Sequence, residues 1–436
     1  MRPRRRAAIG MAMVLLGAAC SGTGARSDGP DIREDVTGTI SFLVFGEPEE
    51  LRAFRNVAAA FAGVERDVTV VLIEASDRDD LLARLSTSIS AGDPPDLFLV
   101  NYRFYAQFAA RGVIEPVAPY LETSDVFSEA DFYPVALDAF RFGGTLTCLP
   151  QNVSSLVVYV NEDRFAEANV AVPRTGWRWT DMVNAARLLT HDEDGDGFTD
   201  VFGVGVDPEI IRLAPFVWSN GGEVVDDPVR PTRFTLDTAR AVEVIQSFSS
   251  LVEPFGVAPN ELEVESQDLE TRFLNGTLAM FLSSRRETPS FRTITDFEWD
   301  VAPLPVFEEP AGILHSDAYC MAGDGENRAA AWRFMEFALG PEGQRITAAT
   351  GRTVPSLIEV ATSRAFLDPS QEPENSRVFL DTIDVIRRIP SISTWPEIED
   401  RANAILEQAM YGDLAPGEAA RRLVEETRVM FARAEG

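Results

Sequence analysis

The first third of the chain alternates short apolar runs with longer amphipathic segments. The runs at 39–45, 68–73 and 97–100 are short and rich in branched or aromatic residues, which is typical of strands. Between them, the segments 49–62 and 78–89 carry apolar residues at helical spacing. Because strands and helices alternate, the pattern predicts a largely parallel sheet covered by helices.

A second pattern of this kind begins near residue 150. Pro150 ends one apolar run, since proline lacks the N–H that a strand ladder needs. A new strand is then expected at 156–160, and a longer helix is expected to begin at Trp179. We interpret the stretch 145–181 as the passage from one α/β lobe to another and as the floor of a ligand cleft.

The first twenty residues have the pattern of a secretory signal peptide. A basic head is followed by an apolar run at 7–16 and by small residues before Cys20. That order resembles a lipoprotein processing site, so Cys20 is expected to carry lipid and to anchor the protein to the cell membrane. Ordinary secretion with an incidental cysteine is the alternative. The segment 21–37 is poor in apolar residues, which favours a flexible tether.

Composition restricts the classes of function. The formal net charge of −30 makes nucleic acid and anionic membrane surfaces poor partners. The sequence has no lysine, which excludes a Schiff-base or P-loop lysine, and two histidines leave little material for a Ser-His-Asp unit. Paired carboxylates for glycan hydrolysis have no recognisable placement, and a glycan hydrolase or lyase stays the alternative to a binding protein.

Two cysteines remain if Cys20 is lipidated. Cys148 and Cys320 both lie beside expected crossings between lobes, and a disulfide across the hinge is one hypothesis. Two separate buried thiols are the other, because the sequence gives no Cα separation.

Five segments, taken in order, resemble the family 1 extracellular solute-binding proteins, the receptor subunits of carbohydrate ABC importers. They read YVNEDRFAEANVAVP with WRWTDMVNAARLLT, then WSNGGEV, FLNGTLAMF, WDVAPLPV and GDLAPGEAARRLVEET. The resemblance implies a two-lobed periplasmic-binding-protein fold of the maltose-binding type, each lobe a mostly parallel sheet flanked by helices, with a hinge of several segments. It also implies a monomer that captures a sugar by lobe closure and delivers it to a membrane permease. A sensor or adhesion role on the same fold is a further alternative.

The expected division follows from these motifs. The N-lobe is predicted to comprise 38–147 and 282–321, and the C-lobe 148–281 and 322–436. The crossings are expected near 146–150, 278–284 and 318–324.

A sugar site needs flat aromatic rings and short polar side chains. Glu47, Tyr102 and Tyr105 follow strand ends in the first lobe and are candidates to face the cleft. For the two tyrosines, packing into the core is nearly as favoured. After the crossing, the resemblance supports Asn152 and Trp218, and Asn220 is a further candidate. Trp179 is a weaker candidate, because a tryptophan at this helix start often packs structurally. Asp317 and Tyr319 precede the return crossing.

A charged ligand is a further possibility. Arg285 and Arg286 stand where many family members have a glycine-rich turn and a tryptophan, and either arginine is suited to a carboxylate or phosphate. The alternative is a solvated pair balancing nearby acids.

The segment 192–200 resembles the first nine positions of a calcium loop. Asp192, Asp194, Asp196 and Asp200 fall at ligand positions, while the twelfth position is glycine, not glutamate. A weak structural calcium site is one interpretation, and an acidic surface turn is the favoured one. No other cofactor is expected.

Overall fold

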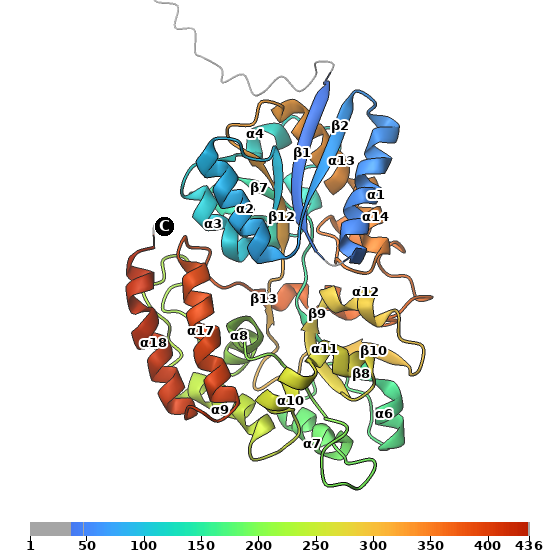
Figure 1. Ribbon diagram of the computed structural model, residues 1–436, viewed down its shortest axis with the longest axis vertical. Coiled ribbons are helices and arrows are strands. Elements are labelled where there is room, and N and C mark those ends of the chain that lie inside the picture. Colours follow the sequence, from blue (N-terminus) through green and yellow to red (C-terminus); the bar gives the residue numbers. More distant parts are fainter. Residues whose placement is uncertain (1–35, 47, 435–436) are drawn as a thin grey trace, which may run out of the picture.

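The computed structural model describes residues 36–46 and 48–434 and consists of two lobes, one above the other (Figure 1). The predicted signal peptide, the lipidation site Cys20, most of the tether and the candidate Glu47 lie outside the described residues. Within the described part, no helix combines the length and the apolar character needed to cross a bilayer.

The N-lobe is built on one sheet with strand order β2-β1-β3-β12-β4, and β7 also pairs with β12. Strand β1 runs parallel to β2 and β3, as predicted, whereas β12 is antiparallel to β3, β4 and β7. The strands are β1 (Gly38–Phe45), β2 (Val68–Ala75), β3 (Leu97–Asn101), β4 (Ile114–Glu115), β7 (Cys148–Pro150) and β12 (Asp317–Ala322).

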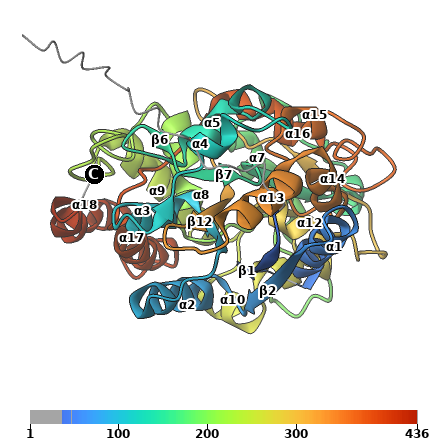
Figure 2. The ribbon, with the colours of Figure 1, turned by 90° about the horizontal axis from the view of Figure 1, so that it is seen from above.

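Helices cover both faces of this sheet. Helices α1, α13 and α14 gather on one side, and α2 and α3 lie on the other (Figure 2). The N-lobe elements are α1 (Pro48–Val64), α2 (Arg78–Ala91), α3 (Tyr102–Ala109), α4 (Ala118–Leu121), η1 (Glu129–Asp131), α5 (Pro134–Asp138), the hairpin β5 (Arg141–Phe142) and β6 (Thr145–Leu146), α13 (Arg328–Leu339), α14 (Pro341–Ala349) and α15 (Ile358–Ala361).

The C-lobe has a smaller sheet, in which β8 (Leu156–Asn161) lies between β10 (Trp299–Ala302) and β9 (Met280–Ser284). Both neighbours are antiparallel to β8, so the prediction of a mostly parallel sheet is wrong for this lobe. Residues 201–206 form only isolated bridges with neighbouring segments, which include a parallel one between Gly205 and Phe281. Long helical segments separate β8 from β9, and the chain re-enters this sheet from the opposite end, so the alternation of strands and helices does not give parallel neighbours here.

The helices of the C-lobe lie below the cleft, and several of them pack around α9. They are α6 (Glu162–Glu167), α7 (Trp179–Leu189), α8 (Ile210–Ser219), α9 (Ala239–Val252), α10 (Glu261–Ser266), α11 (Leu269–Leu274), η2 (Arg285–Glu287), α12 (Thr288–Phe291), α16 (Arg377–Asp381), η3 (Ile383–Val385), α17 (Trp395–Met410) and α18 (Pro416–Ala432); the short strands β11 (Gly312–Ile313) and β13 (Ile386–Arg387) pair with each other. Helices α8, α17 and α18 all contact α9.

The lobe boundaries differ from the predicted ones in the second half of the chain. Strands β9 and β10 pair with β8, which places 282–313 in the C-lobe. Helices α13 and α14 pack on α1, which places 322–349 in the N-lobe. The chain crosses at 151–155, at 314–316 and between α15 and α16. The crossing expected near 278–284 is not formed, because β9 stays in the C-lobe sheet and the residues after it form the short turn η2, which leads into α12.

Cys148 and Cys320 form a disulfide, with their Cα atoms 4.6 Å apart. The two residues are directly opposite in the antiparallel pair of β7 and β12. The bond therefore lies within the N-lobe sheet, beside two of the crossings, and does not join the two lobes as the hinge hypothesis held.

Candidate functional site

A cavity of about 480 Å³ lies between the lobes and is lined by both. Its N-lobe wall comes from the ends of β1 and β3, from the first turns of α2 and α3, and from α1. Its C-lobe wall comes from the start of α8, from η2 and from α17. Since two of the crossings also line it, this cavity lies where movement of the lobes would open or close it.

The position directly after β1 has room only for a glycine. Gly46 lines the cavity, and a Cβ atom there would lie 2.3 Å from a carboxylate oxygen of Glu50. That carboxylate is buried and pairs with Arg352, with a distance of 3.0 Å between Glu50 Oε2 and Arg352 Nη2. Burial raises the pKa of Glu50, and Arg352 opposes this shift. The pair fixes this corner of the cavity.

Helix α3 presents different residues to the cavity from those that the sequence suggested. Tyr102 and Tyr105 are fully buried within the N-lobe and do not line the cavity; the ring of Tyr105 packs on Phe140 at 5.3 Å. Arg103 and Phe104, between them, line the cavity. The prediction selected the correct segment and the wrong face, because residues three apart share a side of a helix and that side is turned to the core.

Arg103 and Glu399 form a buried ion pair between α3 of the N-lobe and α17 of the C-lobe. Both side chains are at most 8% exposed. The other carboxylate oxygen of Glu399 accepts a hydrogen bond from the indole Nε1 of Trp395 at 2.7 Å. This pair contacts both lobes at the wall of the cavity, so opening of the lobes would separate two buried charges.

The floor of the cavity is formed by the two crossing segments that lie side by side. Asn152 donates from Nδ2 to the carbonyl of His315 at 3.2 Å, and its Oδ1 accepts from the Asp317 N–H at 2.9 Å. Asp317 Oδ1 accepts from Asn101 Nδ2 at 3.0 Å. Asn152, His315 and Asp317 all line the cavity. Their position agrees with the candidate roles of Asn152 and Asp317, while their contact with a ligand stays a prediction.

The C-lobe wall carries Arg212 in the first turn of α8, and only 7% of this residue is exposed. Its nearest acids are Glu209, 3.4 Å from Nε, and Asp207, 3.7 Å from Nη2. Burial raises the pKa of Asp207 to about 6, and Arg212 opposes that shift. These distances allow charge attraction but give Arg212 Nε and Nη1 no hydrogen bond within the described chain.

Arg285 lines the cavity but is bound by the protein itself. Its Nε donates to the carbonyl of Gly351 at 2.6 Å, and its Nη1 donates to the hydroxyl of Ser376 at 3.1 Å. The rings of Phe366 and Phe379 each lie 4.8 Å from the guanidinium carbon. Arg285 therefore ties the C-lobe side of the cavity to segments on both sides of the third crossing.

Four other candidates lie outside the cavity lining. Trp179 is stacked between Phe248 and Phe307, with both ring centroids 5.1 Å away. Tyr319 packs on Phe42 in the N-lobe core, at 4.6 Å. Trp218 and Asn220 lie at the far end of α8, where Arg387 covers the indole and Asn220 Nδ2 donates to the Arg240 carbonyl and to Glu243. The prediction that Trp179 packs structurally is confirmed. The prediction that Trp218, Asn220 and Tyr319 lie in the cleft is wrong.

The cavity is rich in arginine and poor in aromatic rings. Phe45 and Phe104 are its aromatic residues, and it is lined by Arg78, Arg103, Arg212, Arg285, Arg286 and Arg352. The guanidinium carbons of Arg78 and Arg103 lie 4.9 and 5.0 Å from the centre of the Phe104 ring. Sequence reasoning missed Arg78, Arg103, Phe104 and Arg212. The available signal was their common position, in the first turn of a helix that follows a strand or loop at the cleft.

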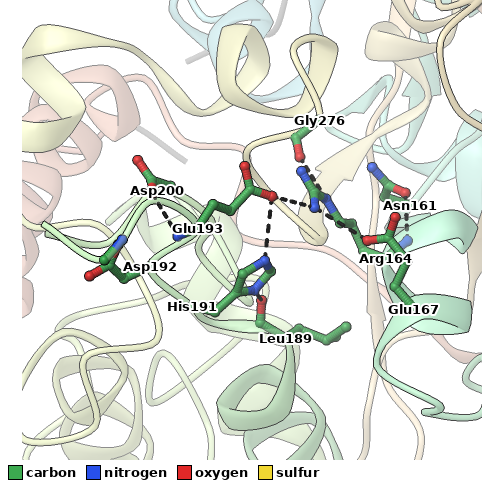
Figure 3. A network of polar contacts seen from close by, with 10 residues as sticks. Asn161, Arg164, Glu167, Leu189, His191, Asp192, Glu193, Asp200 and Gly276 are labelled. Atoms are coloured by element: carbon green, nitrogen blue, oxygen red, sulfur yellow. Dashed lines mark hydrogen bonds and ion pairs between the residues drawn. The ribbon is translucent and has the colours of Figure 1, made fainter. Parts of the chain in front are cut away.

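The predicted calcium loop is an exposed turn between α7 and the C-lobe sheet (Figure 3). Carboxylate oxygens of Asp192, Asp194 and Asp200 lie within 4.8 Å of one another, and Asp196 is not part of this group. Both oxygens of Asp192 already accept backbone N–H groups, from Gly195 at 2.6 Å and Gly197 at 2.8 Å. In Figure 3, Glu193 points away from this group, toward Arg164 and His191. The turn brings together three of the four predicted ligands.

The comparisons with known proteins agree with this architecture. The sequence profile of the bacterial extracellular solute-binding proteins matches residues 46–345, well over half of the chain. The chain belongs to this family. A binding protein of Brucella abortus is 24% identical over 374 residues, which cover 83% of this chain and 86% of the relative. The maltotriose-binding protein of Pyrococcus abyssi is 24% identical over 323 residues, or 72% of this chain and 65% of that protein.

A solved structure shows the same two-lobed fold. The ABC substrate-binding protein Lmo0181 of Listeria monocytogenes, in complex with cycloalternan, superposes with a TM-score of 0.83 at 24% identity. The match covers 90% of this chain and 99% of that one. The predicted maltose-binding type of fold is thus confirmed. Members of this family are receptors that bind solutes outside the cytoplasm, and the relatives named here are binding proteins, not enzymes.

Proposed function

We propose that this protein is the receptor of an ABC importer and captures a carbohydrate or a sugar-like solute between its lobes. The observation that carries the proposal is the cavity of about 480 Å³, lined by both lobes and floored by two crossing segments, in a chain of this family. Its volume suits a small ligand. The maltotriose and cycloalternan of two relatives support a carbohydrate as the ligand class.

The proposed mechanism is closure around the solute. Contacts from both walls favour the closed form, because a solute held by only one lobe would make fewer of them. A micromolar affinity corresponds to about −8 kcal/mol, which stacking and several hydrogen bonds can supply after the costs of ordering. The closed form would then be read by the membrane permease. Lipid on Cys20 would keep the receptor beside that permease, and the solute would be released unchanged.

The test is calorimetric titration of the purified protein with neutral mono- and oligosaccharides, sugar acids and sugar phosphates, followed by recovery of the ligand. We expect one class to bind, small-angle scattering to show a smaller radius of gyration on binding, and mass spectrometry to recover the ligand intact. A consumed ligand would contradict the receptor role and favour a hydrolase or lyase. Absence of binding throughout the panel would contradict carbohydrate capture.

A pair of aromatic variants locates the site. Phe104→Ala removes an aromatic ring that lines the cavity, and the loss of stacking is expected to weaken binding about tenfold. Trp218→Ala is the control, because its ring lies outside the lining. Affinity should be retained in that variant. The reverse result would place the ligand at the far end of α8 and contradict the proposed site.

A further inference from the structure

Three arginines of the cavity carry buried N–H groups that the described chain leaves without a hydrogen bond. In Arg212 these are Nε and Nη1, in Arg78 the group is Nε, and in Arg285, whose Nε and Nη1 are bound by the protein, it is Nη2. A buried donor without an acceptor costs about 1–3 kcal/mol, and more when the group is charged. By contrast, Arg272, in the same lobe and also 7% exposed, donates to the carbonyls of Gln267 and Glu263. Unmet donors are therefore not a general property of buried arginines in this lobe.

The imidazole of His315 lies among cationic groups from both lobes. Its Nε2 is buried and has no hydrogen-bond partner in the described chain. Burial lowers the pKa of His315 well below its ordinary value, and Arg212, Arg103, Arg286 and Arg352 lower it further. Two of these arginines belong to each lobe. Four arginines thus act on the His315 imidazole from two sides of the cavity, although the protein as a whole carries a formal charge of −30.

Most acids of the cavity are already engaged. Glu50 pairs with Arg352, and Glu399 pairs with Arg103. Asp77 caps α2 by accepting the Asp80 N–H at 2.8 Å. The other acids are Asp79 and Asp400, which are exposed, Asp317, which accepts from Asn101, and Glu209. Glu209 faces Arg212 at 3.4 Å and is the main counter-charge near the unmet donors. The lining as a whole holds seven acids and six arginines, so an anion is favoured by the unmet donors and by the arginines around His315, not by net charge.

Building on the proposed receptor function, we propose that the solute carries an anionic group, a carboxylate or a phosphate, which binds against Arg212, Arg78 and His315. Such a group has only acceptor oxygens, so it satisfies N–H donors without presenting donors of its own to the surrounding guanidinium groups. A neutral sugar hydroxyl accepts as well, but it brings a donor and no charge. The substrate class inferred here is acidic or phosphorylated sugars, such as uronates and sugar phosphates.

A matched series of probes tests the charge of the ligand. Glucose and galactose, glucuronate and galacturonate, and glucose 6-phosphate and galactose 6-phosphate are titrated into the purified protein by calorimetry. We expect the acid or the phosphate to bind at least about tenfold more tightly than its neutral parent, since charge-assisted hydrogen bonds are roughly twice as strong as neutral ones. The two charged arms distinguish a carboxylate from a phosphate site.

The outcomes separate this inference from the proposed function. Tighter binding of neutral sugars would overturn the anion site and leave the carbohydrate receptor intact. Absence of binding by every probe, and by the wider panel of neutral oligosaccharides, would overturn both.

Two arginine variants locate the anionic group. Arg212→Gln should lower the affinity for the charged probe by at least about tenfold more than it lowers the affinity for its neutral parent. Arg272→Gln is the matched control, because it removes the same charge from an equally buried arginine of the same lobe, away from the cavity. Equal losses for charged and neutral probes in Arg212→Gln would indicate a merely structural role and overturn the assignment.

Ionic strength supplies a test that needs no variant. Added sodium chloride should weaken binding of the charged probe to the unmodified protein and leave the neutral parent unaffected, because salt screens attraction between charges. Affinity for the charged probe that is insensitive to salt would contradict recognition of the solute through its charge.

Discussion

The interior of each lobe and the cavity between the lobes have opposite chemistry. Inside the C-lobe, Trp179 is stacked between two phenylalanine rings, and in the N-lobe Tyr319 packs on Phe42. The cavity is lined by six arginines and by two aromatic residues. The difference shows that an aromatic side chain near a hinge is more often part of a lobe core, whereas the ligand site is marked by polar side chains at helix starts.

Substitution in the lobe core gives the largest expected effect. Trp179→Ala removes a buried ring that touches Phe216, Phe248 and Phe307 and should lower the free energy of unfolding by about 3–5 kcal/mol. Chemical denaturation of the variant measures the loss. Ligand affinity of the folded variant should match that of the unmodified protein, because Trp179 does not line the cavity.

The control is Phe104→Ala, which reverses the two effects by weakening binding more than it weakens folding. If Trp179→Ala abolished binding while the protein stayed folded, the separation between core and cavity would be wrong.

The sequence predicted the N-lobe well, because its signals are local. The strands around Phe42 and Phe98 and the helices between them occur where apolar spacing placed them. The carboxyl ends of parallel strands meet at one edge, so the segment 101–105 was correctly assigned to the cleft. The choice within that segment failed, since one helical turn carries Tyr102 inward and Arg103 outward, and the sequence does not fix that phase.

The C-lobe was less predictable, because its arrangement depends on pairing between distant segments. Strand β9 returns to pair with β8, and β10 pairs with the other side of β8; Asp300 of β10 lies opposite Val160, which is 140 residues earlier in the chain.

 Residues far apart in the sequence thus form neighbouring strands, and no local pattern reports such pairing. The same limit applies to the buried pair of Arg103 and Glu399.

A smaller effect is expected from the cavity floor, as a dependence of stability on pH. The pKa of His315 is lowered in the folded protein by burial and by the surrounding arginines. As pH falls below about 6.5, the unfolded chain therefore binds a proton at this position before the folded protein does, and stability is lost. One such group contributes at most about 1.4 kcal/mol per pH unit.

Comparison with His315→Gln isolates this contribution, because acids such as the buried Glu50 and the partly buried Asp207 have raised pKa values and act in the opposite direction. Denaturation of both proteins at about pH 7.5 and about pH 5.5 is the measurement. The unmodified protein should lose more stability on acidification than the variant does. Equal losses would mean that His315 becomes protonated in the folded protein, and the effect of burial and of the four arginines on its pKa would be contradicted.

The smallest effect is expected at the acidic turn, which differs from the cavity in being exposed and already satisfied by its own backbone. Asp192 accepts two backbone N–H groups, and these hydrogen bonds, led by the one from Gly197, lower its pKa. The twelfth position is closed to a ligand, because a Cβ atom on Gly203 would lie 2.1 Å from the Ala186 carbonyl oxygen. Calcium at a concentration equal to a weak dissociation constant would add only about 0.4 kcal/mol.

Thermal unfolding with excess calcium and with a chelator should therefore give nearly equal midpoints, in the unmodified protein and in Asp192→Asn alike. A rise of several degrees that Asp192→Asn abolishes would instead establish a calcium site, with its remaining ligands supplied by water or by the backbone of the turn.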